Sequence, residues 1–226
     1  TAVKAALLAN VGVAIAKFAA AAFTGSASML SESVHSVADC ANELVLMLGD
    51  KASDRRSGGS HPFGLHRIKY VASFIVATLL FFVGGIFAVS QAAGKLIGLL
   101  DGALNRNANS LELLAALIVV FISACLESYG LHTSMGEARE RMARVKVEEG
   151  SLFGFWRRTK SAELAAVMME DTLALIGLTF AGLGIGLAMA TGDELYDAIG
   201  GLMVGLVLVT GSAALAFKSG SLLIGE

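Results

Sequence analysis

Proline is almost absent from this chain: Pro62 is the only one among 226 residues. Helix breakers are therefore rare, while hydrophobic residues make up 55% of the sequence and the mean hydropathy is +0.71. A composition this apolar, with so little proline, is typical of polytopic helical membrane proteins. We therefore expect an all-α membrane protein without a soluble core.

Cysteine and net positive charge are also lacking. The two cysteines, Cys40 and Cys125, lie in apolar segments without the C-x2-C spacing of a metal site, which favours buried thiols over a disulfide or a zinc knuckle. The net charge of -2 argues against a nucleic-acid partner, which would need a basic patch. No feature of the sequence predicts a particular protein partner.

Three signatures of membrane-embedded or nucleotide-dependent enzymes are missing. The chain has no H-E-x-x-H motif of an intramembrane zinc protease, no G-x-S-x-G nucleophile elbow and no G-x-x-x-x-G-K-S/T phosphate loop. These absences argue against an intramembrane hydrolase, and we expect a protein that is not an enzyme.

Six segments are apolar for roughly the 20 residues that a spanning helix needs. Some of them extend beyond the membrane, because charged runs such as GEARERMARVK have a helix-forming composition. We expect one transmembrane domain, residues 1–226, with helices at about 5–23, 29–49, 67–95, 110–140, 163–190 and 196–219.

Lysine and arginine gather in the loops after the second and fourth segments. The loops on the other side offer Lys95 and Arg106 and little else. Because positively charged loops stay on the cytoplasmic side, both termini are predicted to be cytoplasmic. A bacterial inner membrane is favoured over an organellar membrane, which stays open.

The run SASMLSESVHSVADCANE in the second segment carries Glu32, His35, Asp39 and Glu43. Their spacing of three or four residues places them in one stripe on a helix. Ionisable groups within a membrane are costly enough to suggest function. His35 and Asp39 would present a nitrogen and a carboxylate on one face, which suits two corners of a zinc site. The alternative is a hydrogen-bonded pair.

Two further acidic positions interrupt apolar segments. Glu170 and Asp171 are adjacent in MMEDTLALIG and point about 100° apart on a helix, so one can face a site while the other faces a neighbouring helix. An interfacial position for this pair is the alternative. Glu127, in FISACLESYG, is a candidate ligand, ligand partner or proton carrier, or else lies at the water boundary.

Two motifs resemble those of the cation diffusion facilitator family, of zinc transporter type. GSASMLSESVHSVADCANE resembles the second-helix motif H/D-x-x-x-D with its preceding small-residue turn, and HPFGLHRIKY resembles the HPFG-x-x-R/K signature that opens the third helix. Asn10 and Lys17 match common family positions. The similarity runs through all six segments and is greatest to the zinc transporter nine branch, for example in MMEDTLALIG.

The resemblance implies a six-helix domain that commonly dimerises and exchanges a divalent cation, often zinc, for protons by alternating access. In the family, the second-helix pair is joined by an H/D-x-x-x-D pair on the fifth helix. His35 and Asp39 match the first pair, and Asp171 matches the last acid of the second. The remaining position is Val167, which cannot bind a metal.

The fourth ligand is therefore open between water and Glu170, which lies about 60° around the helix from Val167. Glu127 and Glu43 are further candidates. Replacing nitrogen by oxygen or water would weaken selectivity for zinc and admit manganese or iron. Most family members also carry a folded cytoplasmic domain after the sixth helix, and we expect this chain to lack it.

The sequence thus predicts a secondary transporter that exports Zn2+, or alternatively Mn2+ or Fe2+, from the cytoplasm in exchange for protons. We expect it to act as a homodimer in the lipid bilayer, with His35, Asp39, Asp171 and Glu170 as metal ligands. The remaining acidic residues, Glu127, Glu43 and Glu32, are expected to serve as accessory groups or a proton path. A membrane metal-binding scaffold or sensor that does not transport is the alternative.

Overall fold

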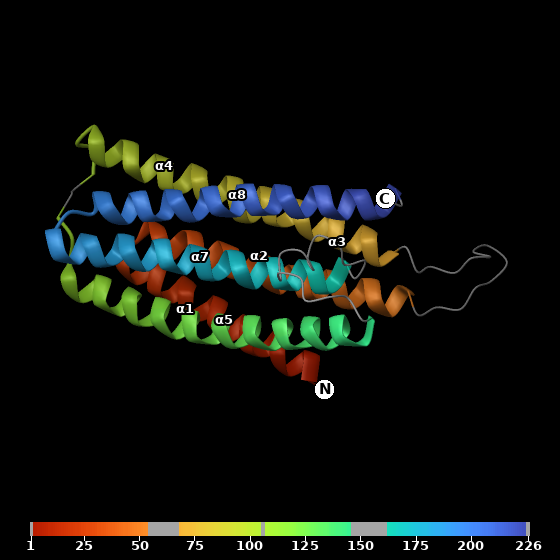
Figure 1. Ribbon diagram of the computed structural model, residues 1–226. Coiled ribbons are helices and arrows are strands. Elements are labelled where there is room, and N and C mark those ends of the chain that lie inside the picture. The colour runs from red at the N-terminus through yellow and green to blue at the C-terminus, as the bar shows by residue number, and fades with distance from the viewer. Residues whose placement is uncertain (1, 54–67, 105–106, 146–161, 225–226) are drawn as a thin grey trace.

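The computed structural model describes residues 2–53, 68–104, 107–145 and 162–224. In these ranges the secondary structure is helical, apart from turns and an isolated bridge between Asn107 and Asp193. Figure 1 shows long helices packed side by side in a bundle. The all-α prediction is confirmed for the described residues, and the HPFG motif lies outside them.

The described helices form six antiparallel rods, the third of which is made of α3, η1 and α4 in succession. Their bounds are α1 Ala2–Thr24, α2 Ala27–Ser53, α3 Ile68–Leu79, η1 Leu80–Ile86, α4 Phe87–Leu100, α5 Ser110–Val145, α7 Ala162–Thr191 and α8 Leu195–Ile224. Both termini lie at the same end of the bundle, here called the near end (Figure 1). The α1–α2, α4–α5 and α7–α8 connections lie at the opposite, far end.

The third rod changes its winding where η1, a π-helix, separates α3 from α4. Gly84 and Gly85 are buried there. An added β-carbon at Gly85 would lie 2.7 Å from Cγ2 of Val209, so the backbone of η1 lies directly against α8. Such π-helical turns are frequent at functional sites. The apolar pattern of 67–95 gave no sign of this change in winding.

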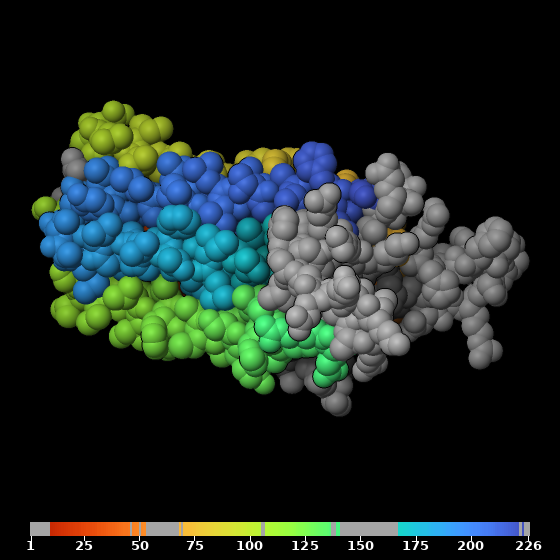
Figure 2. Space-filling view, viewed as in Figure 1, coloured from red at the N-terminus to blue at the C-terminus, as the bar shows by residue number. Residues whose placement is uncertain are grey.

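The bundle has apolar side chains on its outside and charged side chains inside. Phe121 and Phe217 are 70% and 80% exposed, whereas Lys17, Glu32 and His35 are 0% exposed. Figure 2 shows one such outer face, where α4, α8, α7 and α5 follow one another. This arrangement suits a surrounding of lipid, in which the outer surface must be apolar and buried charges need partners.

Within the described ranges, four rods are long and apolar enough to cross a membrane by length and composition: Tyr70–Leu100, Ser110–Gly136, Val167–Thr191 and Leu195–Ser221. α1 contributes a shorter apolar stretch, Asn10–Thr24, and α2 carries the ionisable stripe. The protein is thus a multi-pass membrane protein, while the span count of six and the side on which the termini lie stay predictions.

Glycine lets α2, α7 and α8 approach closely at the far end. A β-carbon on Gly184 of α7 would lie 2.9 Å from the Cα of Gly200 on α8. A β-carbon on Gly200 would lie 2.7 Å from Oγ of Ser28 on α2. Small residues at helix contacts allow this packing within membranes. The contact fixes the start of α2, and with it the height of the ionisable stripe in the bundle.

Candidate functional site

The ionisable stripe of α2 faces the inside of the bundle, because α2 packs against α1, α3, α7 and α8. Glu32 and His35 are fully buried, whereas Asp39 and Glu43 are partly exposed. The stripe therefore runs from a buried far half of the helix toward more accessible groups in the near half. Its periodicity in the sequence correctly indicated one shared face.

A cavity of about 60 Å³ lies beside the near half of this stripe. That volume is enough for a metal ion with a few water molecules. Residues of α1, α2, α5 and α7 line it: Asn10, Val13, Ser36, Asp39, Glu43, Glu127, Val167, Glu170 and Asp171. The fold thus brings the carboxyl-bearing residues of three helices, far apart in the sequence, around one small space.

Three of these carboxylates are held by neutral donors from a neighbouring helix. The bonds are Asn10 Nδ2 to Glu43 Oε1 at 2.6 Å, Asn42 Nδ2 to Glu170 Oε1 at 2.9 Å and Ser134 Oγ to Asp171 Oδ2 at 3.0 Å. An amide or hydroxyl orients a carboxylate without cancelling its charge. The carboxylates therefore stay available to a cation that enters the cavity.

His35 and Asp39 lie side by side without satisfying each other. Nδ1 of His35 is 3.5 Å from Oδ1 of Asp39. Within the described part of the chain, both ring nitrogens of His35 and Oδ1 of Asp39 are buried without a hydrogen-bond partner. Leaving buried polar atoms unpaired is costly. A divalent metal ion would satisfy both groups, because imidazole nitrogen and carboxylate oxygen are its usual ligands.

The predicted ligands share a neighbourhood without converging on one point. Asp39, Glu170 and Asp171 line the cavity, whereas His35 is not part of its lining. Among the described residues, no three or more His, Cys, Asp and Glu side chains are close enough together to hold a metal ion. The ligand set of His35, Asp39, Asp171 and Glu170 therefore stays a prediction.

Val167 lies at the wall of the same cavity, one helical turn from Glu170. An apolar side chain thus faces the space where the resemblance expects a ligand. Glu127 lines the cavity from α5. Its position there agrees with an accessory role, and Glu43 and Asn10 complete the lining toward the near ends of α2 and α1.

Lys17 of α1 contacts the far half of the stripe and is fully buried. Its Nζ is 3.1 Å from Oε2 of Glu32 and 2.8 Å from Oγ of Ser36. The sequence signal was available, since Lys17 interrupts an apolar segment, but the identity of its partners depends on how α1 packs on α2. Ser36 also lines the cavity, so the hydrogen bond between Lys17 and Ser36 lies at the edge of the cavity.

A second polar cluster fixes the far end. Asp197 of α8 accepts hydrogen bonds from Oγ of Ser26 at 2.6 Å and from the backbone N–H groups of Ala27 and Ser28 at 2.6 and 3.2 Å. It therefore caps the start of α2, where the N–H groups have no partner within the helix. Lys95 of α4 lies 3.2 Å from Asp197 Oδ2.

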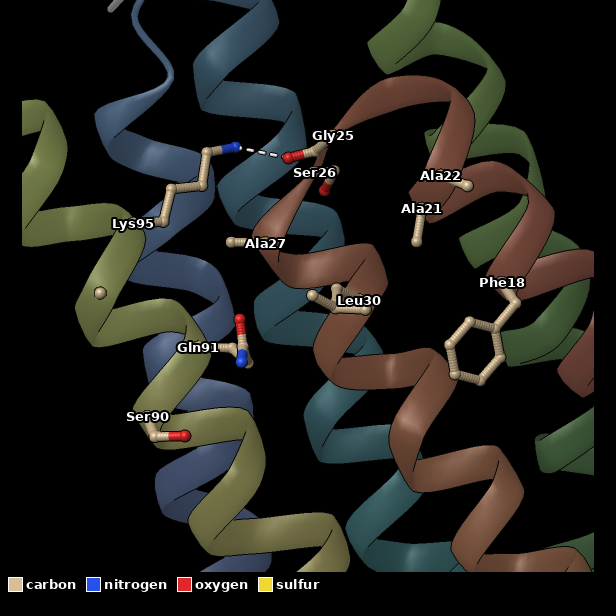
Figure 3. A pocket seen from close by; sticks show the side chains of 11 residues that line it. Phe18, Ala21, Ala22, Gly25, Ser26, Ala27, Leu30, Ser90, Gln91 and Lys95 are labelled. Carbon is tan, nitrogen blue, oxygen red and sulfur yellow. Dashed lines mark hydrogen bonds between the residues drawn. The ribbon is translucent and has the colours of Figure 1, made fainter. Parts of the chain in front are cut away.

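Figure 3 shows Lys95 reaching from α4 to the carbonyl oxygen of Gly25 in the α1–α2 turn, at 2.7 Å. Gly25 has a positive φ of 62°, which glycine adopts without strain. A mostly apolar cavity of about 550 Å³ lies beside this contact, with Phe18 and Leu30 in its lining. The contact ties α4 to the start of α2, well away from the carboxylate-lined cavity.

Comparisons with known proteins match the whole of the described bundle. Residues 3–224 match the family described as the cation efflux transmembrane domain. Two relatives carry the name "Proton-coupled zinc antiporter SLC30A9, mitochondrial". The Xenopus laevis protein is 34% identical to this chain and the Homo sapiens protein 33%, each over 210 residues, or 93% of this chain. "Metal tolerance protein C4" of Arabidopsis thaliana is 30% identical over 92% of this chain and 43% of its own length. The chain spans 36% and 35% of the length of the two antiporters.

Proposed function

The chain belongs to the cation efflux transmembrane domain family, and from that premise we propose that it exports a divalent metal cation, zinc before others, in exchange for protons. The animal relatives are named proton-coupled zinc antiporters, and this chain covers only 36% and 35% of the length of those proteins. Their activity therefore supports a proposal for this chain, not an assignment. Since the named relatives are transporters, transport is favoured over catalysis.

The observation that carries the proposal is the small cavity between α2, α5 and α7. It is lined by Asp39, Glu127, Glu170 and Asp171, and it lies next to a buried histidine whose ring nitrogens have no hydrogen-bond partner among the described residues. Acidic groups inside a membrane mark ion pathways. The cavity offers the oxygen ligands, and His35 offers nitrogen, for a four-coordinate zinc ion.

We propose His35, Asp39, Asp171 and Glu170 as the ligands of the transported ion. A cation beside Asp39, Glu170 and Asp171 would offset the mutual repulsion of their carboxylates. Val167 stands where the resemblance expects a nitrogen or oxygen donor, so three of the four proposed ligands are carboxylates. Such an oxygen-rich ligand set tolerates Mn2+ or Fe2+ as well as Zn2+.

Exchange follows from competition for the same bases. A metal ion needs neutral imidazole and ionised carboxylates, whereas protons occupy those atoms and release the metal. Glu127 and Glu43 line the cavity and are proposed to pass protons to it. The Lys17–Glu32 pair and the Asp197 cluster are proposed to block the path from the cavity to the far end.

The near end is proposed to face the cytoplasm or its topological equivalent, and the bundle is proposed to act as a homodimer. The animal relatives are named mitochondrial. These names do not favour the expected bacterial inner membrane over an organellar membrane. Targeting of a tagged chain in its own cells decides between the two.

The proposed activity is tested in proteoliposomes that contain the purified chain and a zinc-sensitive dye. We expect an imposed proton gradient to drive Zn2+ movement, and Asp39→Asn and Asp171→Asn to abolish it. Asp101→Asn is the matched control, because Asp101 is exposed at the end of α4. Normal transport by both cavity variants would reject the site. Zinc binding without flux in the unaltered chain would favour a scaffold or sensor instead.

A further inference from the structure

We propose that the Lys17 ammonium is a tethered cation that fills a second cation subsite on α2, deeper in the bundle than the proposed metal site. Filling this subsite limits the stripe to a single metal ion. This inference rests on the proposed function, because it concerns how many metal ions the stripe of α2 binds. The subsite itself is defined by the contacts of Lys17 with Glu32 and Ser36.

The residues of this subsite are arranged as donors to a cation. Glu32, His35 and Ser36 are separated by three and four residues and therefore share one face of α2. Oε2 of Glu32 and Oγ of Ser36 approach Nζ of Lys17 at 3.1 and 2.8 Å. A lysine ammonium is a compact point charge, so it stands in for a free cation bound by a carboxylate and a hydroxyl.

The ammonium leaves part of the subsite unused. Oε1 of Glu32 and both ring nitrogens of His35 are fully buried and have no hydrogen-bond partner among the described residues. An ammonium can only donate, and here it uses one oxygen of the carboxylate. A metal ion in its place would draw on both oxygens of Glu32 and on the hydroxyl of Ser36, and it would leave the imidazole of His35 to the ion beside Asp39.

α7 leaves room for the free oxygen of Glu32. A β-carbon at Gly177 would lie 2.6 Å from Glu32 Oε1, closer than real contacts allow. The absence of a side chain at Gly177 thus permits Glu32 to sit inside the bundle with its second oxygen uncovered by protein donors. The subsite is bounded by α1, α2 and α7, and all three helices also line the metal cavity.

The subsite is continuous with the proposed metal site. Ser36 lines the cavity that Asp39 lines, and its hydroxyl accepts a hydrogen bond from Lys17. A metal ion beside Asp39 therefore lies about one helical turn from the ammonium charge. The ammonium neutralises Glu32 and repels the metal ion, which stops at the level of Asp39. Without Lys17, Glu32 would attract a cation of its own.

The test is the number of Zn2+ ions bound per chain, measured by equilibrium dialysis and isothermal titration of the full chain in detergent. We expect Lys17→Met to bind one more Zn2+ than the unaltered chain. The charge-neutral double variant Lys17→Met/Glu32→Gln should return to the unaltered stoichiometry, and Lys17→Arg should keep it. A folded Lys17→Met variant with unchanged stoichiometry would overturn the proposal.

Removal of Lys17 leaves a buried carboxylate without its partner, so Lys17→Met can be unstable without metal. In that case thermal unfolding decides. Recovery of the melting temperature on addition of Zn2+ supports a cation subsite. The proposal is overturned if Zn2+ does not restore the melting temperature of Lys17→Met while Lys17→Met/Glu32→Gln melts normally. Lys17 and Glu32 would then form a structural ion pair only.

The outcome is separable from that of the proposed function. If the unaltered chain neither binds nor transports Zn2+, the proposed function fails. A Glu32-dependent gain of one bound Zn2+ in Lys17→Met would still establish the subsite. The opposite combination is also possible. If a proton gradient drives Zn2+ flux by the unaltered chain and folded Lys17→Met binds no additional Zn2+, the proposed transport function holds and the proposed role of Lys17 fails.

Discussion

Asn42 of α2 donates a hydrogen bond from Nδ2 to Oε1 of Glu170 on α7, at 2.9 Å, and both side chains are buried. The bond joins the helix that carries His35 and Asp39 to the helix that carries Asp171. It therefore sets the relative height of the two halves of the proposed metal site.

Replacing Asn42 by alanine removes the donor that orients Glu170. Partners that orient metal ligands typically contribute about 10–100-fold to metal affinity, and we expect a loss in that range for Zn2+ measured by competition with a chelating dye. Asn109→Ala is the matched control, because Asn109 makes the same type of bond to Glu112 on the exposed surface. Equal Zn2+ affinity of both variants would show that the bond from Asn42 does not orient a metal ligand.

Histidine at position 167 should supply the nitrogen donor that the cavity lacks. Val167 lines the cavity beside Glu170 and Asp171, so Val167→His is expected to tighten Zn2+ binding by roughly tenfold or more and to raise the preference for Zn2+ over Mn2+. Val167→Leu changes the same wall without adding a donor. Indistinguishable affinities and selectivities for the two variants would place the metal away from this wall.

Zinc binding should weaken as the pH falls. Protons compete with the metal for His35 and the carboxylates, so each proton displaced on binding lowers the apparent affinity by about tenfold per pH unit in the range where that group is protonated. Titration between about pH 7.5 and 5.5 measures this dependence. His35→Gln should reduce this dependence. An affinity that stays constant over this range would contradict exchange by competition.

The cluster around Asp197 should stabilise the far end of the bundle. Asp197→Asn removes the charge from a buried group that caps α2 and faces Lys95, and loss of one partner of a buried pair costs about 3–5 kcal/mol. Chemical unfolding in detergent measures the change, with exposed Asp101→Asn as the control. The double variant with Lys95→Met should lose about 0.5–3 kcal/mol less than the sum of the single losses. Strict additivity would show that Lys95 and Asp197 do not act together.

Local spacing was enough to find the rods and the stripe of α2. The apolar segments follow from composition and length, and Glu32, His35, Asp39 and Glu43 share a face because helical periodicity is a property of one segment. The sequence also marked Glu127 and Glu170 as unusual, since acidic residues interrupt apolar runs there.

Contacts between helices could not be read in the same way. The bond from Asn42 to Glu170 and the capping of α2 by Asp197 depend on which helices are neighbours and at what height, which a single sequence does not state. The π-helix η1 likewise depends on the close contact of Gly85 with α8. Local patterns therefore located candidate groups, and tertiary packing decided their partners.

Anomalous diffraction from a crystal of the chain loaded with zinc tests the central claim most directly, because it reports both the ion and its ligands. We expect a zinc peak between α2 and α7, within bonding distance of His35, Asp39 and Asp171. Glu170 or water is expected as the fourth ligand. A zinc peak outside this cavity, with the His35 and Asp39 side chains still unliganded, would contradict it.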